Sequence, residues 1–244
     1  LPGMYDVISG NVGIDQIRKV NVEDLLRRKP VRLEMQSIGS YLKDRCVLVT
    51  GAGGSIGSEL ARQLLNHGPR SIVLLGRGEN SVHEVNRELT ELSSTGIQLK
   101  SVICDVRDRI SLERVFDAVR PDVVFHAAAH KHVYLMEGNP DQAVFNNVFG
   151  THNVVQLCLE YGIRRLVNIS TDKAVNPTSV MGASKRIAEQ VVVRGSMRAK
   201  QDQVFTSVRF GNVLGSRGSV IPIFNEQIRN GGPVTVTHPE MVRY

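Results

Sequence analysis

The fold is decided by the stretch Cys46-Val47-Leu48-Val49-Thr50-Gly51-Ala52-Gly53-Gly54-Ser55-Ile56-Gly57. Residues 46–49 form a short apolar run rich in β-branched side chains, which predicts a buried parallel strand. Glycines follow at once. Residues 55–65 then have a helical pattern that places three apolar side chains on one face: Ile56, Leu60 and Leu64. The stretch therefore predicts a strand, a glycine turn and a helix in direct succession.

Each glycine of the turn has a physical reason to be there. Gly51 makes the tight turn, Gly54 lets the backbone approach a pyrophosphate, and Gly57 lets the helix pack closely on the strand. Ser55 and Ile56 open the helix, where free N–H groups and a partial positive charge favour phosphates. An ordinary tight turn is the alternative, but strand, glycines and helix together are the context of a dinucleotide-binding fingerprint.

The composition bounds the class of protein. A chain of 244 residues with 41% hydrophobic residues can bury the core of one α/β domain, and it holds no apolar run of the ~20 residues that a membrane span needs. Its net charge of +6 and pI of about 9.4 favour an anionic ligand or surface. Nucleic acid is disfavoured because basic residues are scattered and aromatic residues make up only 5%. Three cysteines, an odd number, suit buried thiols in a reducing, cytoplasmic compartment.

Beyond residue 45 the sequence alternates between strand and helix patterns. Five further strands are expected, at 71–75, 98–104, 122–126, 165–170 and 204–210. Further helices are expected at 80–94, 110–119, 139–161 and 180–198. This order predicts an α/β fold, a doubly wound parallel sheet of Rossmann type with helices on both faces. Residues 1–45 are expected to form a short arm with a helix at 22–28, and residues 46–244 the nucleotide-binding domain.

Residues that follow the expected strands are candidates for cofactor contacts. Arg77 stands after the second strand, where a carboxylate would bind the ribose 2′-hydroxyl of NAD, and this favours the 2′-phosphate of NADP. An arginine stacked on adenine, or simply solvated, is the alternative. Asp105 and Val106 follow the third strand and are placed to meet the adenine. After the fourth strand, three small side chains let a cofactor lie close to the backbone: Ala127, Ala128 and Ala129.

Three histidines within seven residues follow the fourth strand and raise the question of a metal site. They are His126, His130 and His132, and no cysteine or acidic residue accompanies them at a ligand spacing. We therefore expect no metal. His126 is expected to be structural, whereas residues 130–133, with His132 and Val133, are expected to line the substrate side.

Polar residues gather at the end of the fifth strand, the edge where such sheets bind ligands. These residues are Ser170, Thr171, Asp172 and Lys173. A hydroxyl, an acid and a base together predict proton transfer; a helix cap or a solvated ion pair is the alternative. On the next helix Met181 and Lys185 lie four residues apart and therefore on one face.

Taken together, six stretches resemble the extended short-chain dehydrogenase/reductases that act on nucleotide sugars. More closely, they resemble the CapD-type polysaccharide-biosynthesis group of UDP-N-acetylglucosamine 4,6-dehydratases. The stretches are VTGAGGSIGSEL, HAAAHKHV, NNVFGTHNV, STDKAVNPTSVMGASKR, RFGNVLGSRGSVIPIF and GGPVTVTHPEMVRY, and they cover nearly all of residues 46–244. The usual YxxxK motif reads Met181…Lys185 here, as in the large members, and a thioether has no proton to transfer.

The resemblance also bears on the ends of the chain. Residues 1–45, with VNVEDLLRR, resemble the juxtamembrane arm of large, membrane-anchored members, in which transmembrane helices and another domain lie upstream. It implies a location at the cytoplasmic face of the membrane. The chain starts without Met and stops at Tyr244 in mid-pattern, so we expect a soluble fragment that binds NAD(P) but turns over UDP-sugar poorly.

The resemblance implies a reaction and a set of roles. NAD(P)+ oxidises C4 of the sugar, a base removes the C5 proton, an acid protonates the departing C6 hydroxyl, and hydride returns to C6. It implies Asp172 as the acid, Lys173 as the base and Thr171 as the partner of the sugar 4-oxygen. Cofactor-side roles are implied for Asn147, Ser170 and Lys185, and substrate contacts for His132, Val133, Asn212, Arg217, Ser219 and Arg243.

Two other functions stay open. A 4-epimerase, or a dehydratase with C5 inversion, is the alternative among enzymes, and a non-catalytic NAD(P)-binding sensor is the alternative of another class. An epimerase needs no acid–base pair to expel a hydroxyl, so Thr171-Asp172-Lys173 favours dehydration. The sequence leaves open the C5 stereochemistry, the pathway and the oligomeric state, for which a homo-oligomer is one option.

Overall fold

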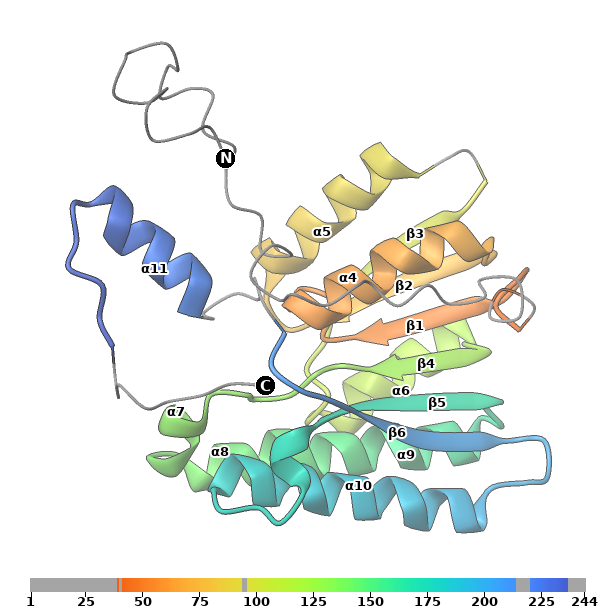
Figure 1. The fold of residues 1–244 in the computed structure, drawn as a ribbon. Coiled ribbons are helices and arrows are strands. Elements are labelled where there is room, and N and C mark those ends of the chain that lie inside the picture. The colour runs from red at the N-terminus through yellow and green to blue at the C-terminus, as the bar shows by residue number, and fades with distance from the viewer. Residues whose placement is uncertain (1–38, 40, 94–95, 214–219, 237–244) are drawn as a thin grey trace. The chain divides into compact units, whose positions relative to one another are not determined.

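A parallel sheet forms the centre of the part of the chain that the structure describes. The structure, a computed structural model, describes residues 39, 41–93, 96–213 and 220–236. Within them the strands lie in the order β3-β2-β1-β4-β5-β6 (Figure 1). The strands are β1 (Cys46–Thr50), β2 (Ser71–Gly76), β3 (Gln98–Ile103), β4 (Val123–His126), β5 (Arg165–Thr171) and β6 (Val204–Phe210). Every strand bound expected from the sequence lies within one residue of the observed one, and the doubly wound α/β fold is confirmed.

The strand order creates a crevice at one place. β1 pairs with β2 on one side, Val47 opposite Ile72, and with β4 on the other, Val47 opposite Val123. The chain therefore runs from β1 through β2 to β3 at one edge and then returns to β4 on the other side of β1. The connection after β1 and the connection after β4 consequently run toward opposite edges of the sheet. Ligands bind at the carboxyl ends of the strands beside such a reversal.

Helices cover both faces of the sheet, α4 and α5 on one side and α6, α9 and α10 on the other (Figure 1). The helical segments are α4 (Ser55–Leu64), η2 (Leu65–His67), α5 (Glu79–Leu92), α6 (Arg109–Val119), α7 (Val133–Glu137), α8 (Pro140–Ala143), η3 (Val144–Phe149), α9 (Gly150–Glu160), η4 (Asp172–Ala174), α10 (Val180–Arg198) and α11 (Val220–Arg229).

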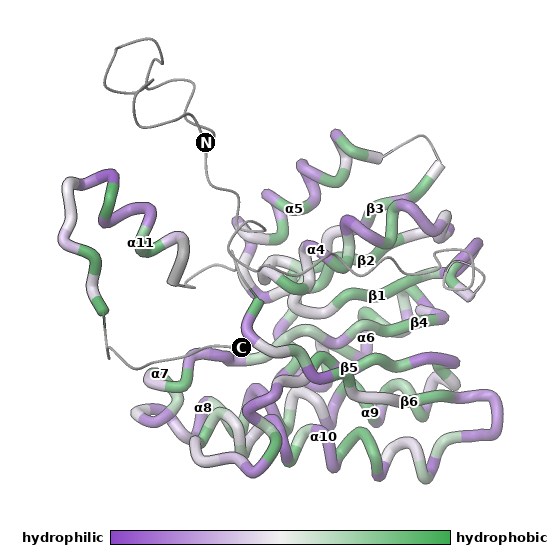
Figure 2. The backbone as a smooth tube through the Cα atoms, in the orientation of Figure 1, coloured by the Kyte–Doolittle hydropathy of each residue, from purple (hydrophilic) through white to green (hydrophobic). Residues whose placement is uncertain are grey.

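Alternate residues of β1 supply two cores, because successive side chains of a strand point to opposite faces. Val47 and Val49 pack in the cluster that includes Leu64 and Leu89, whereas Leu48 packs in the cluster that includes Phe116. Figure 2 shows the apolar colouring along the central strands that results. Burial on both faces explains why β1 is apolar throughout.

The expectation of one helix over 139–161 was wrong in its details. The structure has α8, then six π-helical residues in η3, then α9, and α7 was not expected at all. A π-helical turn inserts an extra residue into the helix and is common at functional sites. Here it accompanies the complete burial of Asn147, whose side chain bonds to other segments.

The buried face of α4 also differs from the expectation. The residues buried are Gly57, Ala61 and Leu64, while Ile56 and Leu60 are only half-buried. The helix turns its small side chains toward the sheet because Gly57 must approach the backbone of the glycine turn closely.

The expected N-terminal arm cannot be compared with the structure. The helix at 22–28 lies outside the described residues, as does most of the 1–45 arm.

All three cysteines, Cys46, Cys104 and Cys158, are buried free thiols, as expected. Burial raises the pKa of Cys104 to about 11, and the charges of Asp108 and Asp105 act in the same direction. Among the described residues no helix is both long and apolar enough to cross a bilayer.

Candidate functional site

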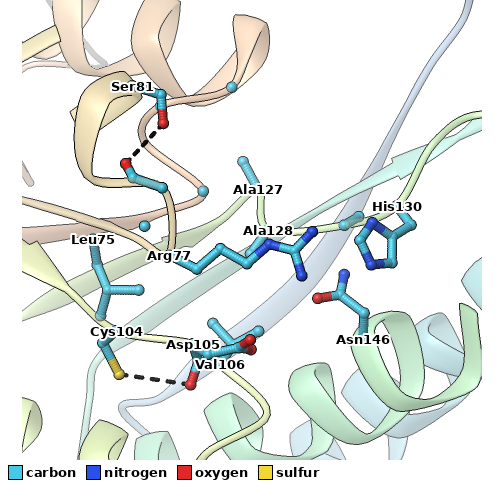
Figure 3. A pocket seen from close by; sticks show the side chains of 16 residues that line it. Leu75, Arg77, Ser81, Cys104, Asp105, Val106, Ala127, Ala128, His130 and Asn146 are labelled. Carbon is cyan, nitrogen blue, oxygen red and sulfur yellow. Dashed lines mark hydrogen bonds between the residues drawn. The ribbon is translucent and has the colours of Figure 1, made fainter. Parts of the chain in front are cut away.

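A cavity of about 280 Å³ lies at the carboxyl ends of β1, β2, β3 and β4 (Figure 3). It is lined by Gly51, Gly53, Gly54, Leu75, Gly76, Arg77, Gly78, Ser81, Cys104, Asp105, Val106, Ala127, Ala128, Ala129, His130 and Asn146. The cavity therefore occupies the crevice that the strand order creates beside β1 and β4.

The glycine turn forms one wall, and each glycine has a distinct environment. Gly51 has φ of +67°, and a Cβ there would lie 2.6 Å from the backbone nitrogen of Ala128. A Cβ on Gly57 would meet the carbonyl of Gly51, so α4 packs against the turn only with glycine at this position. At Gly54 a Cβ would meet only the Gly51 carbonyl oxygen, at 3.2 Å, and otherwise point into open space. This open space beside the start of α4 fits a pyrophosphate.

Charged side chains form the opposite wall. Arg77 extends across the cavity between Asp105 and Ala128 (Figure 3). Arg107 donates from Nε to both carboxylate oxygens of Asp105, at 3.0 and 2.9 Å. Although burial acts the other way, these bonds hold the pKa of Asp105 below its usual value, so Asp105 is a carboxylate. Burial, together with the charges of Arg77 and Arg107, lowers the pKa of His130, which leaves a neutral imidazole in the cavity.

Asn147 ties the loop after β4 to α10. Its Oδ1 accepts from the His130 backbone N–H at 2.8 Å, and its Nδ2 donates to the His130 carbonyl and to Ser184 Oγ, both at 3.0 Å. The neighbouring residue of the π-helical segment, Asn146, lines the cavity. The π-helical segment thus directs Asn147 to neighbouring segments and places the preceding residue, Asn146, at the cavity, where its Nδ2 donates to Asn147 Oδ1 at 3.2 Å.

A second polar cluster lies at the end of β5. Thr171 Oγ1 donates to Asp172 Oδ1 at 2.8 Å, and Lys173 Nζ donates to the same oxygen at 3.0 Å. Lys173 Nζ also donates to Asn212 Oδ1 at 3.2 Å, from the segment that follows β6. Against the effect of partial burial, the bonds from Lys173 and Thr171 lower the pKa of Asp172, which is therefore a carboxylate at neutral pH.

Lys185 is a buried residue of α10. It is only 4% exposed, and its Nζ donates to the Ile169 carbonyl at 2.7 Å. Burial lowers the pKa of Lys185 to about 8, against the attraction of Glu189. Met181, four residues earlier, packs with Met136 and Ala143 in a small apolar cluster. The position where the family usually has tyrosine is thus part of a core contact here.

Glu189 forms a connection that the sequence did not indicate. It accepts from Ser170 Oγ at 2.6 Å and from Arg209 Nε and Nη2 at 2.8 and 2.7 Å. The Arg209 bonds, against the effect of burial, lower the pKa of Glu189 to about 2. Because Ser170 donates to Glu189, its hydroxyl is already engaged with α10.

The structure brings together most of the residues that the sequence analysis assigned to the cofactor. Gly51, Gly54, Arg77, Asp105, Val106, Ala127, Ala128 and Ala129 line one cavity. Ser55 and Ile56 begin α4, and His132 and Val133 stand at the start of α7 without lining this cavity. Arg217, Ser219 and Arg243 lie outside the described residues. Ser81, Cys104 and Asn146 line the cavity without having been singled out, because only their place in the folded chain brings them there.

The fold and this site define a Rossmann domain of the extended short-chain dehydrogenase/reductase class. A family model described as "Polysaccharide biosynthesis protein" matches residues 47–244. The chain belongs to this family.

Known proteins similar to the chain are longer than it. It is 51% identical over its whole length to the capsular polysaccharide biosynthesis protein CapD of Staphylococcus aureus, of which it covers 41%. It is 36% identical, over 81% of the chain and 58% of the relative, to an inverting UDP-N-acetylglucosamine 4,6-dehydratase of Campylobacter jejuni. The solved UDP-glucose 4-epimerase of Thermus thermophilus in complex with NAD has a TM-score of 0.65 and 28% identity, over 78% of this chain and 64% of that one.

Proposed function

We propose that the protein is a nucleotide-sugar 4,6-dehydratase that acts on UDP-N-acetylglucosamine. The observation that carries the proposal is the cluster of Thr171, Asp172 and Lys173, joined by hydrogen bonds at the ligand-binding edge of the sheet. The similarity to the C. jejuni dehydratase supports the substrate and the reaction. Because the chain spans less than two thirds of these relatives, the proposal concerns the full-length protein.

The cavity suits a nicotinamide dinucleotide. The open space at Gly54 fits the pyrophosphate, and the cavity wall at Asp105 and Val106 fits the adenosine. Bound NAD(P)+ would supply the hydride chemistry, by taking hydride from C4 of the sugar and returning it to C6. The NAD complex of the T. thermophilus epimerase supports this cofactor class.

Arg77 favours NADP over NAD. It follows the end of β2 and extends across the cavity, where a carboxylate would otherwise bind the ribose 2′-hydroxyl (Figure 3). A guanidinium presents several N–H donors to a phosphate and keeps its charge, so a 2′-phosphate is the partner that it suits.

Two residues would position the reacting groups. Lys185, fixed by the Ile169 carbonyl, would hold the nicotinamide ribose, and its charge would favour anionic groups nearby. Thr171 would hydrogen-bond the sugar 4-oxygen. In the structure its hydroxyl donates to Asp172, so substrate binding would exchange one partner of this hydroxyl for another.

Asp172 and Lys173 would move the two protons. In the structure Asp172 is a carboxylate, so it must gain a proton before it can protonate the C6 hydroxyl. The Lys173 ammonium lies 3.0 Å from it and can supply that proton, which leaves a neutral amine as the base for C5. Bound substrate excludes water and disfavours both charges, so it favours this transfer.

The assignment to dehydration depends on this pair. An epimerase also oxidises C4, but it needs no acid at C6 and no base at C5. The T. thermophilus neighbour supports epimerisation as the second candidate, whereas the bonded Asp172 and Lys173 favour elimination. The presence of Asp172, Lys173 and Lys185 together in one chain argues against a non-catalytic sensor.

Several further expectations remain proposals. Asn147 would act on the cofactor side through His130, and Ser55, Ile56 and Ser170 would lie along the cofactor. Substrate contacts are proposed for His132, Val133, Asn212, Arg217, Ser219 and Arg243. A membrane anchor outside the described residues, a cytoplasmic location, a homo-oligomer and a sugar-binding part that begins within residues 46–244 are likewise proposed.

Proton NMR of the reaction mixture tests the proposal. Hydride return to C6 makes a methyl group beside C5, so UDP-N-acetylglucosamine incubated with the full-length protein and NAD(P)+ should yield a new methyl doublet. An unchanged spectrum, or one that shows only a C4 epimer, would reject dehydration.

A further inference from the structure

A buried chain of hydrogen bonds connects β1, β4 and α9. Thr50 Oγ1 lies 2.7 Å from His126 Nδ1, and His126 Nε2 lies 3.0 Å from Thr151 Oγ1. The three residues are 0%, 1% and 1% exposed. No step of the proposed reaction uses His126, although it is a fully buried titratable group.

The hydrogen-bond chain of Thr50, His126 and Thr151 admits one arrangement of donors and acceptors. Thr151 Oγ1 donates its only proton to the Asn147 carbonyl at 2.6 Å, so it must accept from His126 Nε2. His126 therefore carries its proton on Nε2. Burial, and after it the charge of Lys185, lower the pKa of His126 to about 3, so the imidazole is neutral and Nδ1 is an acceptor.

The direction of the hydrogen bond at the Thr50 end follows from the same count of donors and acceptors. Since Nδ1 accepts, Thr50 donates its hydroxyl proton to it. The Thr50 oxygen is then free to accept the backbone N–H of Ala128, which lies 3.4 Å away. Every polar atom of the chain has a partner, and each partner depends on the tautomer of His126.

The hydrogen-bond chain connects three segments that shape the cavity: the glycine turn, the alanine wall and the π-helical segment. Thr50 immediately precedes Gly51 of the glycine turn, and Ala128 belongs to the wall that contacts this turn. Thr151 fixes the carbonyl of Asn147, whose side chain holds His130 and Ser184. A change in these hydrogen bonds would therefore shift the turn, the alanine wall and the π-helical segment relative to one another.

We propose that His126, fixed as the neutral Nε2–H tautomer by Thr50 and Thr151, is a positioning residue that sets the affinity of the cavity for its dinucleotide. The proposal rests on the cofactor-binding part of the proposed function. It does not depend on the substrate or on the reaction.

Nitrogen-15 NMR of the histidine side chains tests the tautomer without any ligand. We expect His126, assigned by loss of its signals in His126→Gln, to show a protonated Nε2 and an unprotonated Nδ1, unchanged between about pH 5 and pH 8. A protonated Nδ1, an equal mixture of tautomers or titration within this range would overturn the proposal.

Two variants of Thr151 test the effect on the cavity. Thr151→Val removes the acceptor of Nε2, so we expect the proton to move to Nδ1 and NAD(P) to bind about 3- to 10-fold more weakly. Thr151→Ser keeps the hydroxyl and should restore the affinity to within about twofold of wild type. Calorimetric titration with NAD(P) measures the affinity of each variant. Thermal unfolding of the same samples would show that each variant is folded.

The two arms of the experiment separate the possible failures. An unchanged NAD(P) affinity in folded Thr151→Val, or no recovery in Thr151→Ser, would overturn the positioning role. A wild-type protein that binds neither NAD nor NADP would overturn the proposed cofactor and, with it, this role. In that case the tautomer measured by NMR would still confirm or reject the hydrogen-bond arrangement.

Discussion

Lys173 Nζ lies 3.2 Å from Asn212 Oδ1, so a lysine at the end of β5 is held by an asparagine that follows β6. A second N–H of the same ammonium donates to Asp172. Because the N–H bonds of an ammonium are tetrahedral, fixing two of them fixes the third direction. Once the proton on the second N–H has moved to Asp172, the amine would have to turn about its Cε–Nζ bond to present the freed lone pair to a C5 proton along this third direction, and the Asn212 contact would hold Nζ in place while it turns.

Loss of the Asn212 contact should therefore slow proton removal more than binding. We expect Asn212→Ala to lower the rate of deuterium exchange at C5 about 10- to 100-fold in the full-length protein, with a smaller change in KM. Asn86→Ala on α5 is the control and should leave both unchanged. A large rise in KM at a normal exchange rate would mean that Asn212 serves the UDP group instead.

The glycine turn allows a test that separates folding from cofactor binding. Gly54 has extended dihedral angles, φ −83° and ψ 164°, and its Cβ direction is largely open, so Gly54→Val should fold but fail to bind NAD(P). Gly57→Ala should instead lower the melting temperature, because the new Cβ meets the Gly51 backbone. Normal NAD(P) affinity of Gly54→Val by calorimetry would remove the pyrophosphate from this position.

Cofactor choice should depend on Arg77. Arg77→Ala removes charged hydrogen bonds to a 2′-phosphate, worth about 1.5–3 kcal/mol, and should weaken NADP roughly 10- to 150-fold while sparing NAD. Dissociation constants for both cofactors measure this directly. If both weaken equally, Arg77 serves only to stack on the adenine.

The buried carboxylate of Glu189 should make stability depend on pH. Its pKa is depressed to about 2 from the usual 4.5, so its contribution to stability is present above about pH 4.5 and is lost as the pH falls toward 2. Glu189→Gln should cost about 2–4 kcal/mol at neutral pH and lose less stability on acidification than wild type does.

A matched control for Glu189 is Glu88→Gln. Glu88 pairs with Arg62, but its side chain is 44% exposed, so its loss should cost less than about 1 kcal/mol. Denaturant unfolding at several pH values measures both variants. Parallel pH curves for wild type and Glu189→Gln would show that this carboxylate has an ordinary pKa.

The strands and the cofactor cavity could be predicted because their signals are local. Apolar runs bounded by glycine identify parallel strands, and the carboxyl ends of parallel strands must meet at one edge. Arg77 and Asp105 could therefore be assigned to one cavity from their positions after two neighbouring strands. The spacing of Gly51, Gly54 and Gly57 likewise predicted the close packing at Gly57, and the pyrophosphate that it predicts at Gly54 has open space beside it.

The contacts made over long sequence separations could not be predicted. Nothing near Ser170 indicates that its hydroxyl donates to Glu189, nineteen positions along the chain. The π-helical segment was not predicted from the sequence for the same reason, because it depends on the partners of Asn147 in another loop and in α10. The apolar pattern of 139–161 carries only the average helical period.

The mass of the product formed in D₂O tests the central claim most directly. The full-length protein with UDP-N-acetylglucosamine and NAD(P)+ should yield a product that has lost one water and gained one deuterium at C5, because hydride moves from C4 to C6 while C5 receives its proton from solvent. Lys173→Ala should abolish this product. A product of unchanged mass, with inverted C4 and no deuterium, would contradict the account and indicate an epimerase.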